Sequence, residues 1–171
     1  MIEQSSLRNA ESLIRFGAEK LSSISNVPRL EAEVLLSNLL KINPMKFHTD
    51  DIGISSNVMN KFESMIESRF KGMPIAYLIG KKEFWSLDFE INPSVLVPRP
   101  ETELLIENAI ELLKDHESPR ILELGTGSGI ISIVLYKELV TPEITATAVS
   151  YTHLRAHETK ANLVCRLQLE K

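Results

Sequence analysis

The sequence predicts an α/β protein with an N-terminal all-α domain: a small helical bundle, a β-hairpin connector, and then the beginning of a parallel-sheet domain. Apolar residues recur at helical spacing over roughly the first seventy positions. Apolar and polar residues then alternate between Ala76 and Val97, which is typical of strands. A helix, a short strand, a glycine-rich loop, a second helix and a second strand follow, ending near Val149, in the order of a β-loop-α-β unit.

Three helices account for the first segment. Residues 7–21 carry an apolar stripe that fits an amphipathic helix. A second helix is expected to begin at Pro28, because proline suits the first helical position, with Asn26 as its cap. Either Ser55 or Ser56 is expected to cap a third helix. These elements predict a helical bundle over residues 1–75.

The alternating segment is predicted to be a hairpin that connects two domains, over residues 76–99. Phe84, Leu87 and Phe89 fall at strand spacing. Asn92-Pro93-Ser94 is expected to form the hairpin turn, since asparagine and proline both favour turns.

Composition excludes several classes of protein. The chain is 43% hydrophobic and 25% charged, as in ordinary soluble proteins, and its net charge of −4 argues against a general nucleic-acid binder. A single cysteine, Cys165, allows no internal disulfide. No basic leader precedes an apolar run, and no apolar stretch is long enough for a bilayer. We therefore expect a cytoplasmic monomer without membrane or direct nucleic-acid partners.

A glycine-rich loop is the main chemical signal. A strand from Arg120 to Leu124 runs directly into Gly125, Gly127 and Gly129, and an apolar helix follows. Glycines permit a tight turn and let the backbone approach a ligand that a Cβ would exclude. Free amides at a helix start favour anionic or polar groups, so the loop is the predicted ligand site.

The glycine spacing fits a dinucleotide site poorly. The third small residue of that fingerprint falls on Ile130 or on Ser132, depending on which glycine begins the count. The pattern Glu123-x-Gly-x-Gly-x-Gly instead resembles motif I of class I S-adenosylmethionine methyltransferases. That resemblance implies that residues 100–149 are the first part of a Rossmann-like domain whose cofactor is S-adenosyl-L-methionine. It also implies a set of cofactor-binding residues: Glu123, which would help to hold the charged end, Gly125, Thr126, Gly127, Ser128 and Gly129.

Two further segments narrow the resemblance. Gly72-Met-Pro-Ile-Ala-Tyr-Leu-Ile-Gly80 and Val95-Leu-Val-Pro-Arg-Pro-Glu-Thr-Glu103, together with the glycine loop, resemble the release-factor glutamine methyltransferase family (HemK/PrmC type). The resemblance implies N5-methylation of the glutamine amide in the Gly-Gly-Gln motif of peptide-chain release factors, with the helical domain docking the release factor. It also implies a pocket-supporting role for four residues: Arg99, Pro100, Glu101 and Thr102.

Part of the family pattern is missing from this sequence. The family binds the substrate amide with an Asn-Pro-Pro-Tyr motif, and here Asn43-Pro44 and Asn92-Pro93 continue differently and precede the loop. No residue is therefore predicted to be catalytic, and we expect the chain to be an inactive fragment. His153 and His157 share a helical spacing, but no third ligand accompanies them, so no metal site is predicted.

The resemblance stops near Ser150. An acidic residue that binds the ribose is expected about 20 residues after the loop, and Ser150 holds that position. Residues 150–171 carry a formal charge of +2, against −6 for the rest (−4 − 2 = −6). They are predicted to be a non-family tail that follows an interrupted coding sequence. The alternative is a naturally divergent tail with a short helix from about Leu154 to Leu169.

Two other functions remain open at this stage. One is a fragment of a nicotinamide-dependent oxidoreductase, and the other is a non-enzymatic module whose bundle docks a partner protein. In any of these cases a sheet of two parallel strands would leave apolar faces and edges uncovered.

Overall fold

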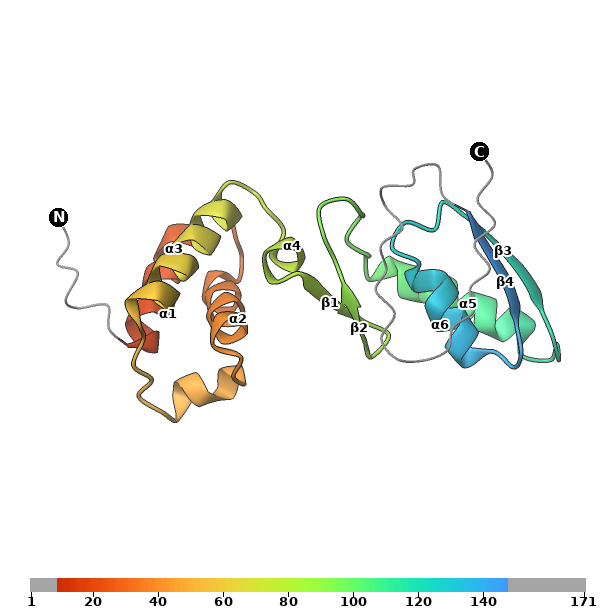
Figure 1. Ribbon diagram of the computed structural model, residues 1–171, viewed down its shortest axis with the longest axis horizontal. Helices are drawn as coiled ribbons and strands as arrows, with labels where there is room; N and C mark the ends of the chain where they lie inside the picture. The colour runs from red at the N-terminus through yellow and green to blue at the C-terminus, as the bar shows by residue number, and fades with distance from the viewer. Residues whose placement is uncertain (1–8, 148–171) are drawn as a thin grey trace. The chain divides into compact units, whose positions relative to one another are not determined.

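The computed structural model describes residues 9–147 and divides the chain into two units, between Ile79 and Gly80 (Figure 1). The predicted tail over 150–171, including Cys165 and its two histidines, lies outside the described residues.

The first unit is a helical bundle. Its helices are α1 (Ala10–Leu21), α2 (Pro28–Leu40), α3 (Ser56–Phe70) and the short α4 (Ile75–Ile79), with a 3₁₀ turn, η1, over Pro44–His48. Helices α1, α2 and α3 pack against one another, and α4 packs on α2 and α3. Because α4 joins this bundle, the unit extends beyond the boundary expected at residue 75.

One continuous apolar core holds the bundle together. Phe62 and Ile66 of α3 are fully buried against α1 and α2, together with Leu13, Ile14, Leu21, Leu35 and Leu36. Gly17 lets α1 approach α3 closely. A Cβ there would lie 2.9 Å from Ile66 Cδ1 and 3.0 Å from Phe62 Cζ. The apolar stripe predicted over residues 7–21 is thus confirmed in α1, where Leu13, Ile14 and Leu21 face the core.

The helix starts were predicted with mixed success. Ser55 caps α3, and its Oγ accepts a hydrogen bond from the Val58 amide at 3.4 Å, as expected. The prediction that Asn26 caps α2 was wrong. Val27 holds the cap position without a side-chain bond, while the Ser25 hydroxyl accepts from the Val27 amide at 3.1 Å. Pro28 at the first position has no amide hydrogen, which reduces the need for a cap.

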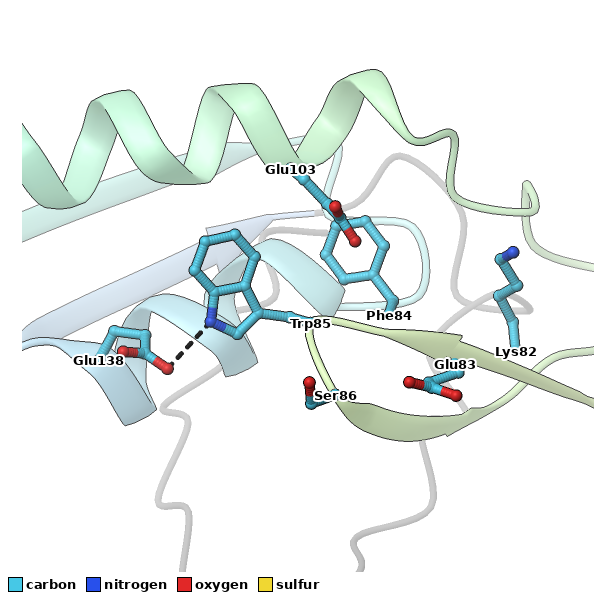
Figure 2. A pocket seen from close by; sticks show the side chains of 7 residues that line it. All are labelled: Lys82, Glu83, Phe84, Trp85, Ser86, Glu103 and Glu138. Carbon is cyan, nitrogen blue, oxygen red and sulfur yellow. Dashed lines mark hydrogen bonds between the residues drawn. The ribbon is translucent and has the colours of Figure 1, made fainter.

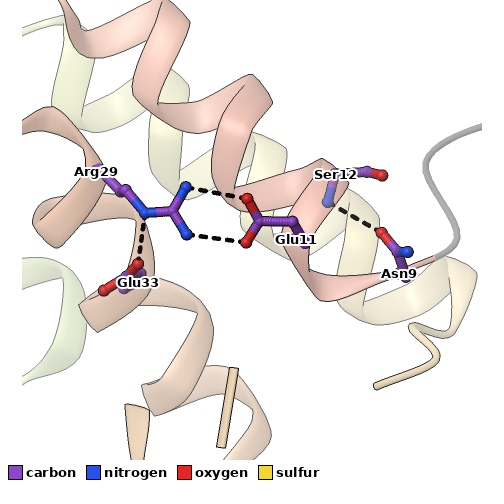
Figure 3. A network of polar contacts seen from close by, with 5 residues as sticks. All are labelled: Asn9, Glu11, Ser12, Arg29 and Glu33. Atoms are coloured by element: carbon purple, nitrogen blue, oxygen red, sulfur yellow. Dashed lines mark hydrogen bonds and ion pairs between the residues drawn. The ribbon is translucent and has the colours of Figure 1, made fainter. Parts of the chain in front are cut away.

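Ion pairs link the helices of the bundle at its surface. Arg29 of α2 donates to both carboxylate oxygens of Glu11 on α1, at 3.0 and 2.9 Å, and also to Glu33 (Figure 3). The hydrogen bond from Arg29 holds the pKa of Glu11 below its ordinary value. Arg69 of α3 makes a similar pair with Glu31, at 2.9 Å. The Arg29–Glu11 pair is half-exposed, and such pairs add little stability, whereas Arg69 and Glu31 are mostly buried.

The second unit begins with a hairpin and continues with a β-loop-α-β segment. Its elements are β1 (Lys81–Phe84), β2 (Leu87–Glu90), α5 (Glu101–Leu113), β3 (Arg120–Leu124), α6 (Ile130–Glu138) and β4 (Glu143–Thr147). Strands β1 and β2 are antiparallel, and β3 and β4 are parallel, with Arg120 opposite Glu143. Helix α6 is the crossover between the parallel strands, which is the normal connection for such a pair.

The hairpin turn is not where the sequence predicted it. Trp85 and Ser86 form the turn, and both have positive φ angles, of 54° and 55°. Asn92-Pro93-Ser94 is a separate turn after β2, closed by a bond from the Val95 amide to the Asn92 carbonyl. Two-residue hairpins require left-handed backbone and usually contain asparagine and glycine. The bulky pair Trp85-Ser86 therefore gave no turn signal.

The structure confirms the predicted fold class, an N-terminal helical domain followed by the start of an α/β fold. One face of the parallel pair is uncovered, because Leu122 and Leu124 of β3 are 62% and 76% exposed. This agrees with the expectation that two parallel strands would leave apolar surface open. Within residues 9–147, no helix combines the length and the apolar character needed to cross a membrane.

Candidate functional site

The glycine loop lies between β3 and α6, where the sequence placed it. Gly125, Gly127 and Gly129 all have positive φ angles, of 78°, 56° and 76°. The amides of Gly125 and Thr126 both donate to the carbonyl of Thr147, at 2.8 and 2.9 Å, which fixes the loop to the end of β4. A left-handed backbone is costly for residues with a Cβ, and this explains three glycines in five positions.

Among the described residues, the outer side of this loop is uncovered. Within residues 9–147, the amides of Gly127 and Ser128 donate to no protein acceptor. A Cβ on Gly125 would meet nothing within 4 Å, and one on Gly127 only the Gly125 carbonyl, at 4.0 Å. The space above the loop could therefore admit a ligand. Free amides at the start of α6 suit a carboxylate or another polar group.

Glu123 is held in place by two hydroxyl groups. Thr126 Oγ1 donates to Glu123 Oε2 at 2.9 Å, and Ser132 Oγ of α6 donates to the same oxygen. Thr126 and Ser132 are buried, 7% and 2% exposed. The side chain of Thr126 thus faces Glu123. In the sequence, Ser132 was noted only as one possible position for the third small residue of the dinucleotide fingerprint. Its hydrogen bond to Glu123 joins α6 to β3 and is visible only in the structure.

The four residues predicted to support the pocket lie at the start of α5. Pro100 occupies the cap position of this helix, and the Arg99 carbonyl accepts from the Thr102 amide at 3.0 Å. Arg99 and Glu101 are exposed. Within the described part of the chain, none of these side chains forms a hydrogen bond or an ion pair with the glycine loop. Their supporting role stays a prediction.

A second concavity lies beside the hairpin turn and was not foreseen from the sequence. It measures about 670 Å³ and is lined by Lys82, Glu83, Phe84, Trp85, Ser86, Glu103 and Glu138 (Figure 2). Trp85 Nε1 donates to a carboxylate oxygen of Glu138 on α6 at 2.9 Å, which fixes the turn against that helix. Three of the seven lining residues are glutamates, and no buried side-chain polar atom among the described residues is left without a hydrogen bond. The glycine loop is the better candidate site.

The described residues contain no group of three or more His, Cys, Asp or Glu side chains that could hold a metal ion. The chemistry available at the loop is therefore that of backbone amides and one oriented carboxylate. Such a set can bind a ligand with both an anionic and a cationic group, as an amino acid has.

Comparison with known proteins relates the chain to one family of enzymes. Residues 12–80 match the family model described as the PrmC N-terminal domain. The curated release factor glutamine methyltransferase of Coxiella burnetii is 39% identical over 145 residues, which cover 84% of this chain. Its counterpart from Shewanella oneidensis is 35% identical over 147 residues, or 85% of the chain. Over most of its length the chain is therefore similar to the release factor glutamine methyltransferases.

The match to this family is partial in one respect. The aligned residues cover 52% of the Coxiella protein and 50% of the Shewanella protein, so the chain spans about half the length of the curated relatives it matches. A third relative with the same name, from Buchnera aphidicola subsp. Schizaphis graminum, is 44% identical over 119 residues, 42% of its length. The family resemblance read from the sequence is thus confirmed.

Proposed function

We propose that this chain is the N-terminal part of an S-adenosylmethionine-dependent methyltransferase that methylates the glutamine side chain of peptide-chain release factors in the cytoplasm. The observation that carries the proposal is the open glycine loop with free amides beside an oriented glutamate. It occurs in a chain whose relatives are named release factor glutamine methyltransferases.

The loop fits the amino-acid end of S-adenosylmethionine. The Gly127 and Ser128 amides would donate to its carboxylate, and Glu123 would accept from its ammonium group. Gly125 leaves room for the ligand, because a side chain there would fill the open space. Once bound, S-adenosylmethionine supplies an electrophilic methyl group on a sulfonium. The residues described here bind and orient that donor.

The acceptor in this proposal is the N5 atom of glutamine in the Gly-Gly-Gln motif. An amide nitrogen is a poor nucleophile because its lone pair is delocalised into the carbonyl. An enzyme must therefore align the nitrogen with the methyl group and stabilise the charge that develops. The family resemblance assigns this task to an Asn-Pro-Pro-Tyr motif, which residues 1–171 do not contain. We therefore expect these residues alone to bind the cofactor without transferring its methyl group.

The remaining roles in the proposal belong to the helical unit and to the start of α5. The helical unit would dock the release factor, and Arg99, Pro100, Glu101 and Thr102 would support the substrate pocket. That the chain is a monomer and binds no nucleic acid directly stays a prediction.

Isothermal titration calorimetry of the full chain tests this proposal. We expect S-adenosylmethionine to bind at one site and NAD to give no binding heat. Binding of NAD without S-adenosylmethionine would instead support an oxidoreductase. Binding of a purified release factor without either cofactor would reduce the chain to a docking module.

A further inference from the structure

The contacts of Glu123 point to a positioning role for a residue outside the glycine loop. Ser132 is 2% exposed on α6, and its hydroxyl donates to Glu123 Oε2 on β3. A serine within a helix usually bonds its hydroxyl to the carbonyl one turn earlier or to water. Here the hydroxyl instead links a helix to a strand nine positions earlier in the chain.

Two donors on one oxygen fix the direction of this carboxylate. Thr126 Oγ1 of the glycine loop donates to the same Oε2 at 2.9 Å. A free glutamate side chain populates many rotamers, and ordering it when a ligand binds has an entropic cost. Ser132 and Thr126 hold the Glu123 side chain before any ligand arrives. The side chain therefore loses its conformational entropy when the protein folds, and ligand binding does not bear this cost.

The same arrangement leaves the second carboxylate oxygen available. Across residues 9–147, Glu123 Oε1 accepts no hydrogen bond from the protein. The backbone carbonyl of Glu123 is engaged by Thr147 Oγ1 at 3.2 Å, so the main chain at this position is fixed as well. The result is a rigid carboxylate with one satisfied and one open oxygen, next to the open loop.

We propose that Ser132, with Thr126, orients Glu123 so that Oε1 accepts the ammonium group of S-adenosylmethionine. The inference rests on the proposed function and adds a residue to it. Ser132 acts through Glu123 and does not itself touch the ligand. Removal of the Ser132 hydroxyl should therefore lower the affinity for ligands that carry the ammonium group and leave the affinity for other ligands unchanged.

The test compares two ligands and three variants by calorimetry on the full chain. S-adenosylmethionine carries the amino-acid end, and 5′-methylthioadenosine is a related nucleoside thioether without it. Ser132→Ala is expected to lower the affinity for S-adenosylmethionine roughly tenfold, because the hydrogen bond that orients the charged Glu123 carboxylate is lost. It should change the affinity for methylthioadenosine by less than about twofold. Ser132→Thr keeps the hydroxyl and should retain the preference for the amino-acid end.

Ser37→Ala is the matched control. Ser37 is also a buried helical serine, 8% exposed, and its hydroxyl bonds to the Val34 carbonyl in the other unit. It should affect neither ligand. The sole tryptophan, Trp85, is bonded to α6 and reports whether each Ser132 variant keeps its fold.

Three results would overturn the inference. Ser132→Ala could bind S-adenosylmethionine as tightly as the unaltered chain, or it could weaken both ligands equally, which is the mark of a structural role. Alternatively, Ser132→Thr could fold and yet lose the preference that the hydroxyl should preserve. A chain that binds no S-adenosylmethionine even with Ser132 intact would refute the proposed function itself, a distinct outcome.

Discussion

Phe62→Ala is expected to lower strongly the urea concentration at which the helical unit unfolds. Phe62 is fully buried between α1 and α2, and truncating such a side chain to alanine typically costs about 3–5 kcal/mol. A unit of some seventy residues has only about 4–10 kcal/mol of unfolding free energy in total. The cavity would therefore remove a large share of it. Loss of helical circular dichroism during urea unfolding measures the effect.

Phe70→Ala is the matched control for this prediction. Phe70 ends the same helix and is 41% exposed, so its truncation leaves no enclosed cavity. We expect it to cost less than about 1.5 kcal/mol. Trp85 lies in the second unit, so its fluorescence should respond to neither variant in the way the helical signal does. Equal losses from Phe62→Ala and Phe70→Ala would contradict the core described here.

Gly127→Val is expected to weaken S-adenosylmethionine binding by about five- to thirtyfold, because holding the loop in its left-handed conformation costs on the order of 1–2 kcal/mol for a residue with a Cβ. Gly127 has a φ of 56°, and its amide donates to no acceptor within the described residues. A β-branched side chain would also occupy the open space above the loop. Calorimetric titration of the full-length variant measures the change.

Gly53→Val controls for the general effect of adding a side chain to a glycine. Gly53 is exposed, has no positive φ, and a Cβ there would meet nothing within 4 Å. It should bind S-adenosylmethionine as the unaltered chain does. If Gly127→Val bound equally well while folded, the ligand would not lie against this loop.

The features predicted correctly from the sequence are those that local pattern determines. The core face of α3 follows from apolar spacing, and the loop before α6 follows from three glycines between a strand and a helix. Ser55 was recognised because a serine before an apolar periodic run is a local cap signal. In each case the residues that decide the structure are close together in the chain.

The features that were missed depend on contacts between distant residues or on unusual backbone. The turn at Trp85-Ser86 has left-handed residues that carry side chains, and the bond from Trp85 to Glu138 spans 53 positions. Helix α4 has five residues, and its packing on α2 and α3 places it in the bundle and outside the connector. The hydrogen bond from Ser132 to Glu123 joins α6 to β3, and no local sequence pattern signals it.

A chimeric enzyme tests the central claim most directly. Residues 1–147 would be joined to the part of the Coxiella burnetii relative that lies beyond its matched region, since the two proteins are 39% identical over 145 residues. We expect this chimera to transfer a labelled methyl group from S-adenosylmethionine to a release factor with an intact Gly-Gly-Gln motif. A release factor with alanine in place of that glutamine should accept none. The assignment would be contradicted by a folded chimera that binds S-adenosylmethionine but methylates neither the intact release factor nor its alanine variant. Equal methylation of the two release factors would contradict it as well.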